Sequence, residues 1–212
     1  MCVFAITAII SINFYLRPTL PEINLVDQSE LQMPLKVYTK DEKLIGEFGE
    51  IKRRAISYEE IPDDIKNAFL AAEDDNFFYH QGISYTGLLR SLLRCLRPSG
   101  CEGGGGTITM QVVRGYLLTR EQTIIRKLKE IFLALELESN LEKEEILELY
   151  VNRIFLGNRS YGIQAAANTY FDKSLSELNI SESATIAALA QLPSRVNPVK
   201  DPRRTLQRRN WI

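Results

Sequence analysis

Residues 123–138 read TIIRKLKEIFLALELE, and this stretch decides the fold class. Its apolar residues recur at helical spacing, which predicts an amphipathic helix with one core-facing stripe. The stripe consists of Ile125, Leu128, Phe132 and Leu135. A helix of this length and pattern is typical of a domain whose core is built by helices.

Other stretches repeat the helical pattern on both sides. KEEILELYVN at 143–152 and SESATIAALAQL at 181–192 have the same period. A further helix is expected to begin at Pro62, because proline is favoured at the first helical position. Asp63 and Asp64 follow it and suit the positive end of a helix dipole. The chain is therefore predicted to be mainly α.

One segment departs from the helical pattern. PLKVYTKDEKLIGEFGE at 34–50 alternates in two short runs and predicts a small β-hairpin near the amino end. Prolines and weak periodicity before it indicate a linker. We expect three parts: an apolar segment at 1–17, a linker with the hairpin at 18–60, and a helical domain at 61–212.

The amino end, MCVFAITAIISINFYL, is uncharged over residues 1–16 and stops at Arg17. A full membrane span needs ~20 apolar residues. We favour part of a transmembrane helix. A signal-peptide core and a buried helix stay open, although no A-x-A site follows and no basic residue precedes the stretch. Because the far end also stops inside a helix-like run, we expect a cut before a further domain after Ile212.

Composition limits the functional classes. A chain of 212 residues, 45% hydrophobic and 25% charged, fits one domain or one domain with a small appendage. A net charge of −1 gives no indication of nucleic-acid binding. Three cysteines and a single histidine are too few for a structural zinc site, and we expect Cys95 and Cys101 to be free thiols, with a disulfide as the alternative. Arginines near the carboxyl end are interpreted as solvated surface: Arg203, Arg204, Arg208 and Arg209.

The first chemical constellation is AAEDDNFFYHQG at 71–82. On a continuous helix, Glu73, Phe77 and His80 would share one face. A carboxylate beside aromatic rings loses water, so the pKa of Glu73 should rise toward the range of a general base. The structural alternative is the polar end of a core helix, with His80 capping the last carbonyls.

The second constellation is GCEGGGGTITMQVVRG at 100–115. Four consecutive glycines allow the backbone to approach a ligand and direct N–H groups at an anion. This is not a Walker loop, because no Gly-Lys-Ser/Thr follows. A flexible glycine linker is the alternative. Further donors and a cation follow the glycines: Thr107, Thr109, Gln111 and Arg114.

The third constellation is Arg126, Lys127 and Glu130, within one arc opposite the apolar stripe. The alternative is an exposed face with salt bridges worth about a few tenths of a kcal/mol each. Taken together, the acids, donors and cations suit a sugar hydroxyl that attacks a carbon bearing a phosphate leaving group.

These motifs resemble the peptidoglycan glycosyltransferase domain (family 51) of class A penicillin-binding proteins, along nearly the whole chain. The patterns E-D-x-x-F with His-x-Gly, G-G-S-T-I-T-x-Q, R-K-x-x-E and K-x-x-I-L-E-x-Y-x-N occur in order, and AALAQLPSRVNP resembles the last motif. They are carried by Glu73, Asp74, Phe77, His80, Gly82, residues 104–111, Arg126, Lys127, Glu130, and residues 143–152 and 187–198.

The resemblance implies a lysozyme-like helical fold with a membrane-associated jaw subdomain, on the outer (periplasmic) side of the bacterial inner membrane. It implies polymerisation of lipid II into glycan strands by inverting glycosyl transfer, with release of undecaprenyl pyrophosphate. Glu73 would be the base and Glu130 would assist at the pyrophosphate. No cofactor is obligatory, and a divalent cation (Mg²⁺ or Mn²⁺) at Glu130 stays open. Expected substrate-binding residues are Asp74, Phe77, His80, Gly104, Gly105, Thr107, Gln111, Arg114, Arg126, Lys127 and Asn152.

Expected partners are lipid II, the growing glycan strand, membrane lipid, moenomycin-type inhibitors and other cell-wall synthesis proteins, with no nucleic acid. No Ser-x-x-Lys or Lys-Thr-Gly occurs, so acyl-enzyme chemistry of that type is absent from these residues. The chain departs from the family pattern with Gly106 for Ser, Arg114 for a frequent Lys, and Gly115 for a frequent Asn; the stretch at 192–198 is also short. A lytic glycosidase that cuts strands and a non-catalytic scaffold are the competing hypotheses.

Overall fold

A computed structural model describes residues 16–21, 35–41, 43–48, 56–89, 106–118, 124–193 and 195–212. The predictions for the apolar stretch at 1–15, for the linker at 22–34, for Gly104 and Gly105, and for the thiols of Cys95 and Cys101 lie outside the described residues. Among the helices that are described, none is both long and apolar enough to cross a membrane.

The described part of the chain is mainly helical, as the sequence predicts. Its α-helices are α2 (Asp63–Glu73), α4 (Ile108–Tyr116), α5 (Ile124–Asn140), α6 (Lys143–Arg153), α7 (Ile163–Phe171), α8 (Ile180–Leu189) and α9 (Pro202–Trp211). Short 3-10 helices are η1 (Arg17–Thr19), η3 (Tyr58–Glu60), η4 (Phe77–Tyr79) and η5 (Leu175–Glu177).

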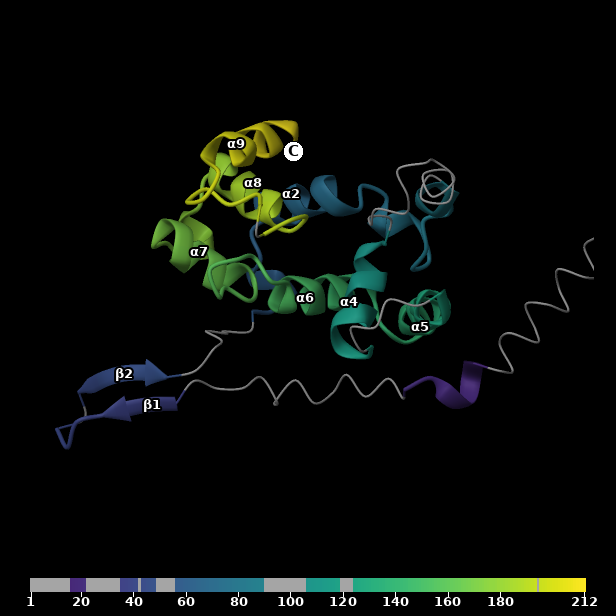
Figure 1. Ribbon diagram of the computed structural model, residues 1–212, viewed down its shortest axis with the longest axis horizontal. Coiled ribbons are helices and arrows are strands. Elements are labelled where there is room, and N and C mark those ends of the chain that lie inside the picture. The colour runs from purple at the N-terminus through teal and green to yellow at the C-terminus, as the bar shows by residue number, and fades with distance from the viewer. Residues whose placement is uncertain are drawn as a thin grey trace, which may run out of the picture.

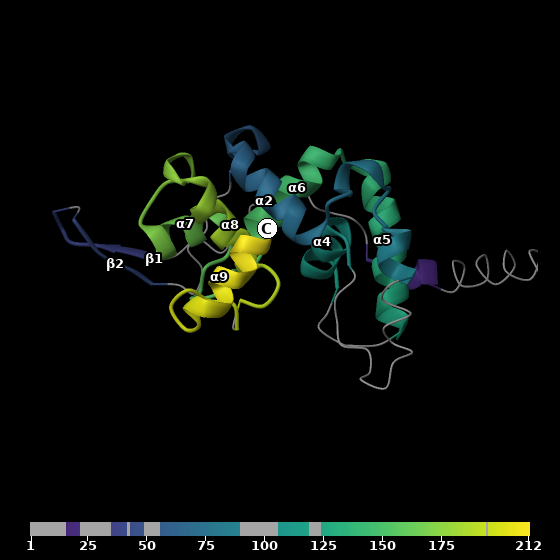
Figure 2. The same ribbon diagram turned by 90° about the horizontal axis from the view of Figure 1, so that it is seen from above.

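Two strands, β1 (Leu35–Tyr38) and β2 (Leu44–Phe48), lie in the segment whose alternation predicts a hairpin. They pair antiparallel, with Leu35 opposite Phe48 and a register irregularity at the end of β1. The hairpin projects away from the helices in both views (Figure 1, Figure 2). The candidate site is therefore built by the helical part.

The helices form two packed groups that share one core. In one group α8 packs against α2 and α9, and in the other α4 packs against α5 and α6 (Figure 1). Buried apolar side chains from both groups belong to a single cluster, which includes Phe69 of α2, Val113 of α4, Leu137 of α5, Leu147 of α6 and Ile186 of α8. This shared core fixes α2 relative to α4 and α5, and these three helices carry the candidate site.

The start of α4 is set by its own sequence. The side chain of Thr107 accepts a hydrogen bond from the backbone N–H of Met110, which is the usual N-cap arrangement. The same Thr107 hydroxyl donates to the carbonyl of Gly82 at 2.6 Å. One side chain therefore starts the helix and ties it to the segment after α2.

The predicted apolar stripe of α5 is wrong. Ile125 is 52% exposed and Leu135 is 39% exposed. The buried face lies on another arc of the helix and consists of Glu130, Leu133, Ala134 and Leu137. This helix carries apolar residues on two arcs, so the period alone indicates a helix but not which arc α4 covers.

The prediction that Glu73, Phe77 and His80 share one continuous helix is also wrong. The helix α2 ends at Glu73, because Asp74 leaves the helical region with φ −160° and ψ 78°. A short 3-10 turn, η4, carries Phe77. At this point the Asp74 carboxylate accepts a hydrogen bond from the backbone N–H of Ile108. Asp74 thus contacts another helix where α2 ends.

Candidate active site

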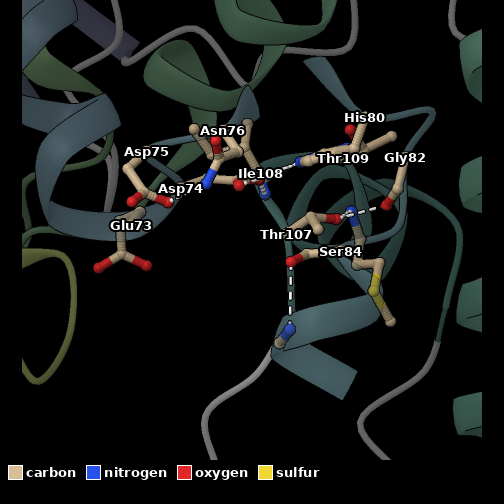
Figure 3. Close-up of polar contacts among 12 residues, drawn as sticks. Glu73, Asp74, Asp75, Asn76, His80, Gly82, Ser84, Thr107, Ile108 and Thr109 are labelled. Carbon is tan, nitrogen blue, oxygen red and sulfur yellow. Dashed lines mark hydrogen bonds and ion pairs between the residues drawn. The ribbon is translucent and has the colours of Figure 1, made fainter. Parts of the chain in front are cut away.

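Glu73 lies at the carboxyl end of α2 and faces α4. The side-chain amide of Gln111 donates a hydrogen bond to Glu73 Oε2 at 2.8 Å. Figure 3 shows the Glu73 carboxylate directed away from the carboxylate of its neighbour Asp74. The two adjacent acids therefore serve different contacts.

The pKa of Glu73 is raised above its ordinary value, and burial is the main cause. The hydrogen bond from Gln111 and the charges of Arg208 and Arg114 oppose this rise, whereas the charge of Asp74 adds to it. The direction agrees with the expectation from the sequence. A carboxylate with a raised pKa is a stronger base, which suits it to take a proton from a hydroxyl group.

Asp74 is buried and joins three segments of the chain. One carboxylate oxygen accepts from the N–H of Ile108 at 3.0 Å, and both oxygens lie 3.0 Å from His80 Nε2 (Figure 3). Ile108 is the first residue of α4, so the negative charge also lies at the positive end of that helix. His80 therefore contacts a carboxylate rather than the last carbonyls of α2.

Gly82 is required by the shape of this segment. Its φ is +76°, and a Cβ at this position would lie 2.8 Å from the carbonyl oxygen of Ala134 in α5. Since L-residues rarely adopt that φ and the contact is with backbone, only glycine fits without strain. The His-x-Gly pattern is thus explained by close packing on α5.

Glu130 is the centre of a cluster of cations. It is 1% exposed, and its carboxylate lies 2.9 Å from Lys127 Nζ. Arg126 Nε lies 3.6 Å away on the same helix, and Arg114 Nε reaches it from α4 at 3.4 Å. The structure therefore brings the second and third sequence constellations together. It also shows that Glu130 is buried, so the alternative of an ordinary exposed helix face is wrong for this residue.

The helix α4 connects Glu73 to the cations. Gln111 and Arg114 are three residues apart and lie on the same face of the helix. Gln111 contacts Glu73, and Arg114 contacts Glu130. One turn of α4 thus links the half-buried Glu73 carboxylate to a positively charged cluster.

The surroundings of Glu130 do not fit a divalent cation. Its two oxygens already face Lys127, Arg114 and Arg126, and a metal ion would meet three positive charges. Within the described ranges, no group of three or more His, Cys, Asp or Glu side chains converges. The cluster around Glu130 carries more positive than negative charge, which favours an anion over a cation.

A second ion pair supports the loop after Glu73. Lys143 donates to Glu138 at 2.8 Å and to the carbonyl of His80 at 2.6 Å. Glu138 also accepts from the Thr109 hydroxyl at 2.5 Å. This network joins α4, α5 and α6 behind the site. Thr109 is therefore a support for the site and does not line it.

Some of the predicted site residues have structural partners. The side-chain amide of Asn152 donates to the Ile56 carbonyl at 2.8 Å and accepts from the Ile56 N–H at 3.0 Å. Phe77 is fully buried, with Lys143 Nζ 4.5 Å from its ring centroid. The Thr107 hydroxyl contacts the Gly82 carbonyl and the Met110 N–H. Direct contact of these residues with a substrate stays a prediction.

Gly106 lies close to two of the cations. A Cβ at this position would be 2.9 Å from Arg114 Nη2 and 4.0 Å from Lys127 Nζ. The backbone of Gly106 therefore approaches both cations closely. The glycine that replaces the family's serine leaves this space to the Arg114 guanidinium.

The sequence analysis missed two residues near Glu73. Arg208 of α9 was assigned to the solvated surface, but its Nη2 donates to the Ala72 carbonyl at 3.0 Å. Tyr150 of α6 is buried, and its hydroxyl has no hydrogen-bond partner among the described residues. Burial raises the pKa of Tyr150 well above its ordinary value, and the charges of Glu73 and Asp74 add to the rise. Tyr150 stands in the K-x-x-I-L-E-x-Y-x-N pattern, but that pattern does not place it near Glu73, and Arg208 stands in none of the quoted patterns.

Comparison with known proteins points to one family. Residues 41–212 match the family described as Transglycosylase. The chain is 50% identical over 198 residues to penicillin-binding protein 1A of Pseudomonas aeruginosa, covering 93% of this chain and 24% of that protein. It is 49% identical over 185 residues to penicillin-binding protein 1A of Haemophilus influenzae, covering 87% of this chain and 22% of that protein.

A solved structure is also similar. The 2.6 Å crystal structure of penicillin-binding protein 1A from Haemophilus influenzae aligns with a TM-score of 0.48 and 35% sequence identity, over 85% of this chain and 17% of that chain. The chain spans about a quarter of the length of the curated relatives named above.

Proposed function

The chain belongs to the transglycosylase family, and from this premise we propose that it is a peptidoglycan glycosyltransferase domain that polymerises lipid II into glycan strands. The observation that carries the proposal is the single face of α4 that joins the half-buried Glu73, through Gln111, to the cations around Glu130, through Arg114. A base next to an anion-binding cluster is the arrangement that glycosyl transfer from a pyrophosphate requires.

In this proposal Glu73 is the general base. Its carboxylate accepts the proton of the 4-hydroxyl group of the acceptor lipid II, and that oxygen attacks the anomeric carbon of the donor strand. The attack inverts the anomeric carbon. The raised pKa of Glu73 strengthens it as a proton acceptor, and the Gln111 hydrogen bond fixes its orientation.

The cations receive the leaving group. As the bond between the anomeric carbon and the pyrophosphate oxygen breaks, negative charge grows on undecaprenyl pyrophosphate. Arg114, Arg126 and Lys127 are held together by the Glu130 carboxylate, and the side chains of Arg114 and Lys127 remain over 40% exposed. Glu130 thus keeps three positive charges close to one another while two of them stay open to a ligand.

We further propose a lysozyme-like fold with a membrane-associated jaw, on the outer side of the bacterial inner membrane. Support comes from the segment directly after Glu73, where large apolar side chains face solvent. They are Phe78, Tyr79, Tyr85 and Leu89, of which Tyr79 is 89% exposed. Aromatic side chains of this kind are favoured where water meets lipid.

The proposed partners follow from the same chemistry. They are lipid II, the growing strand, membrane lipid, moenomycin-type inhibitors that occupy the cationic cluster, and other cell-wall synthesis proteins. No metal is assigned to any step, because the charges around Glu130 favour an anion.

The direct test is incubation of the purified chain with lipid II in detergent, followed by separation of products on a gel. We expect a ladder of glycan polymers that moenomycin abolishes. Purified sacculi incubated in parallel distinguish the reaction class. Soluble fragments from sacculi, without polymer from lipid II, would assign a lytic glycosidase instead.

A further inference from the structure

Arg208 connects the carboxyl-terminal helix α9 to the end of α2. Its Nη2 donates to the carbonyl of Ala72, the residue directly before Glu73, at 3.0 Å. The carbonyls in the last turn of a helix lack helical partners, so a cation there satisfies one of them and opposes the negative end of the dipole. Figure 1 and Figure 2 both show the end of α9 close to α2.

The guanidinium of Arg208 is held on a second side. Its central carbon lies 4.2 Å from the ring centroid of Trp211, one turn further along α9. A planar guanidinium stacked on an indole ring loses little freedom when it also donates a hydrogen bond. The Arg208 guanidinium thus has one partner at the end of α2 and another on α9.

The charge of Arg208 lowers the pKa of Glu73. Burial is the main influence and raises the pKa of Glu73, and the hydrogen bond from Gln111 opposes it. Among charged neighbours, Arg208 has the largest effect and lowers that pKa, ahead of Asp74, which raises it, and Arg114, which lowers it. Arg208 is distant in sequence, yet it offsets part of the cost of burying the base.

We propose that Arg208 is a positioning residue for the base: it holds the last turn of α2 through the Ala72 carbonyl and places a positive charge beside the Glu73 carboxylate. This inference rests on the proposed glycosyl transfer, and it deepens that proposal by naming a residue that positions the base. Arg208 acts through Glu73 and is assigned no contact with substrate.

Several groups from different helices surround Glu73, and the test must separate their effects. Tyr150 stays neutral over the working range, because burial raises its pKa well above the ordinary value. Gln111 does not titrate. The charged and titratable groups that face Glu73 are Asp74 beside it, Arg114 of α4, Tyr150 of α6 and Arg208 of α9.

The experiment compares Arg208→Gln with Arg209→Gln in the lipid II polymerisation assay, with kcat/KM measured from pH 5.5 to pH 9. Arg209 is a matched control, since it is the next residue, carries the same charge and contacts Asn210 on the surface. We expect Arg208→Gln to lose roughly tenfold at the acidic end and only about twofold at the alkaline end, because activity follows the ionised fraction of the base. Arg209→Gln should follow the wild-type profile.

Arg208→Lys provides a second variant that keeps the charge. It should restore the acidic part of the profile, with a lower kcat at every pH because an ammonium lacks the fork that holds both the carbonyl and the ring. An equal loss at every pH in Arg208→Gln, or a rise in KM with an unchanged profile, would overturn the inference and assign a structural or a substrate-binding role.

A readout independent of activity completes the test. The carboxyl carbon of Glu73, labelled with carbon-13 and assigned by its absence in Glu73→Gln, is titrated by NMR in the 212-residue chain. A midpoint that moves to higher pH in Arg208→Gln and not in Arg209→Gln supports the inference. An unmoved midpoint overturns it, even if the wild-type chain polymerises lipid II. If the midpoint moves but the wild-type chain makes no polymer, the proposed function fails and only the electrostatic link remains.

Discussion

Asp74→Asn tests whether the two adjacent acids have separate roles. Asp74 is 8% exposed, and its carboxylate accepts from the Ile108 N–H while lying 3.0 Å from His80 Nε2. Asparagine has nearly the same shape, but it offers one oxygen and an NH₂ group instead of two accepting oxygens. The NH₂ group must then face either the Ile108 N–H, which is a donor, or His80 Nε2, which would have to become an acceptor.

The magnitude follows from these contacts. A hydrogen bond to a charged group contributes about 1.5–3 kcal/mol. One such bond is lost, the other becomes a bond to a neutral oxygen, and the negative charge at the start of α4 disappears. We expect the free energy of unfolding to fall by about 2–3 kcal/mol. For a chain of this size the melting temperature should then drop by about 4–12 °C.

The assay is thermal and urea unfolding, followed by circular dichroism, with Asp75→Asn as the control. Asp75 is the next residue, is exposed and contacts only Asn76 among the described residues, so its substitution should change stability by less than about 0.5 kcal/mol. Equal stability of Asp74→Asn and Asp75→Asn would refute the role of Asp74 as the joint between α2 and α4.

Three further predictions concern the same region. Gly82→Ala should lower the free energy of unfolding in urea by about 2–4 kcal/mol, because the φ of +76° is strained for alanine and the new Cβ meets the Ala134 carbonyl at 2.8 Å. Glu130→Gln should lower it by roughly 1–3 kcal/mol in the same assay, less than for a fully buried pair, because the side chains of two of its cationic partners are 42% and 43% exposed. Glu73→Gln should melt at the same or a higher temperature than wild type at neutral pH. The pKa of Glu73 is higher in the folded state than in the unfolded state. The free energy of unfolding of the wild-type chain therefore falls as the pH rises above the ordinary pKa of 4.5. The stability advantage of the variant should vanish below that pH.

Each of these predictions has a contrary outcome. A stable Gly82→Ala would mean that the segment after α2 is not packed on α5 as described. Unchanged stability in Glu130→Gln would show that the cations do not depend on the carboxylate. A Glu73→Gln variant less stable than wild type at neutral pH would show that the folded state stabilises the ionised form of Glu73. Ionisation of Glu73 would then not destabilise the fold.

The sequence predicted the residue types of the site better than their geometry. Glu73, Gln111, Arg114 and Glu130 lie in patterns that indicate acid–base chemistry beside a phosphate. The link between them could not be predicted from spacing, because it depends on α4 packing against α5 in one register. The buried arc of α5 shows the same limit, since Glu130 lies inside and Ile125 lies outside.

The role of Arg208 was beyond the sequence for a different reason. A run of arginines on a polar helix is typical of solvated surface, and Arg203 and Arg204 are exposed as expected. Arg208 differs only because α9 packs on α8, which in turn packs on α2. A contact across 136 positions of the chain leaves no local signal.

The central claim is that Glu73 is the base of a glycosyl transfer, and the most direct test is the initial rate of lipid II polymerisation by Glu73→Gln relative to wild type. Glutamine keeps the shape and removes the proton acceptor, so we predict a loss of about 10²–10⁴-fold, with circular dichroism unchanged. A variant that folds and polymerises lipid II at a near wild-type rate would contradict the assignment of Glu73 as the base.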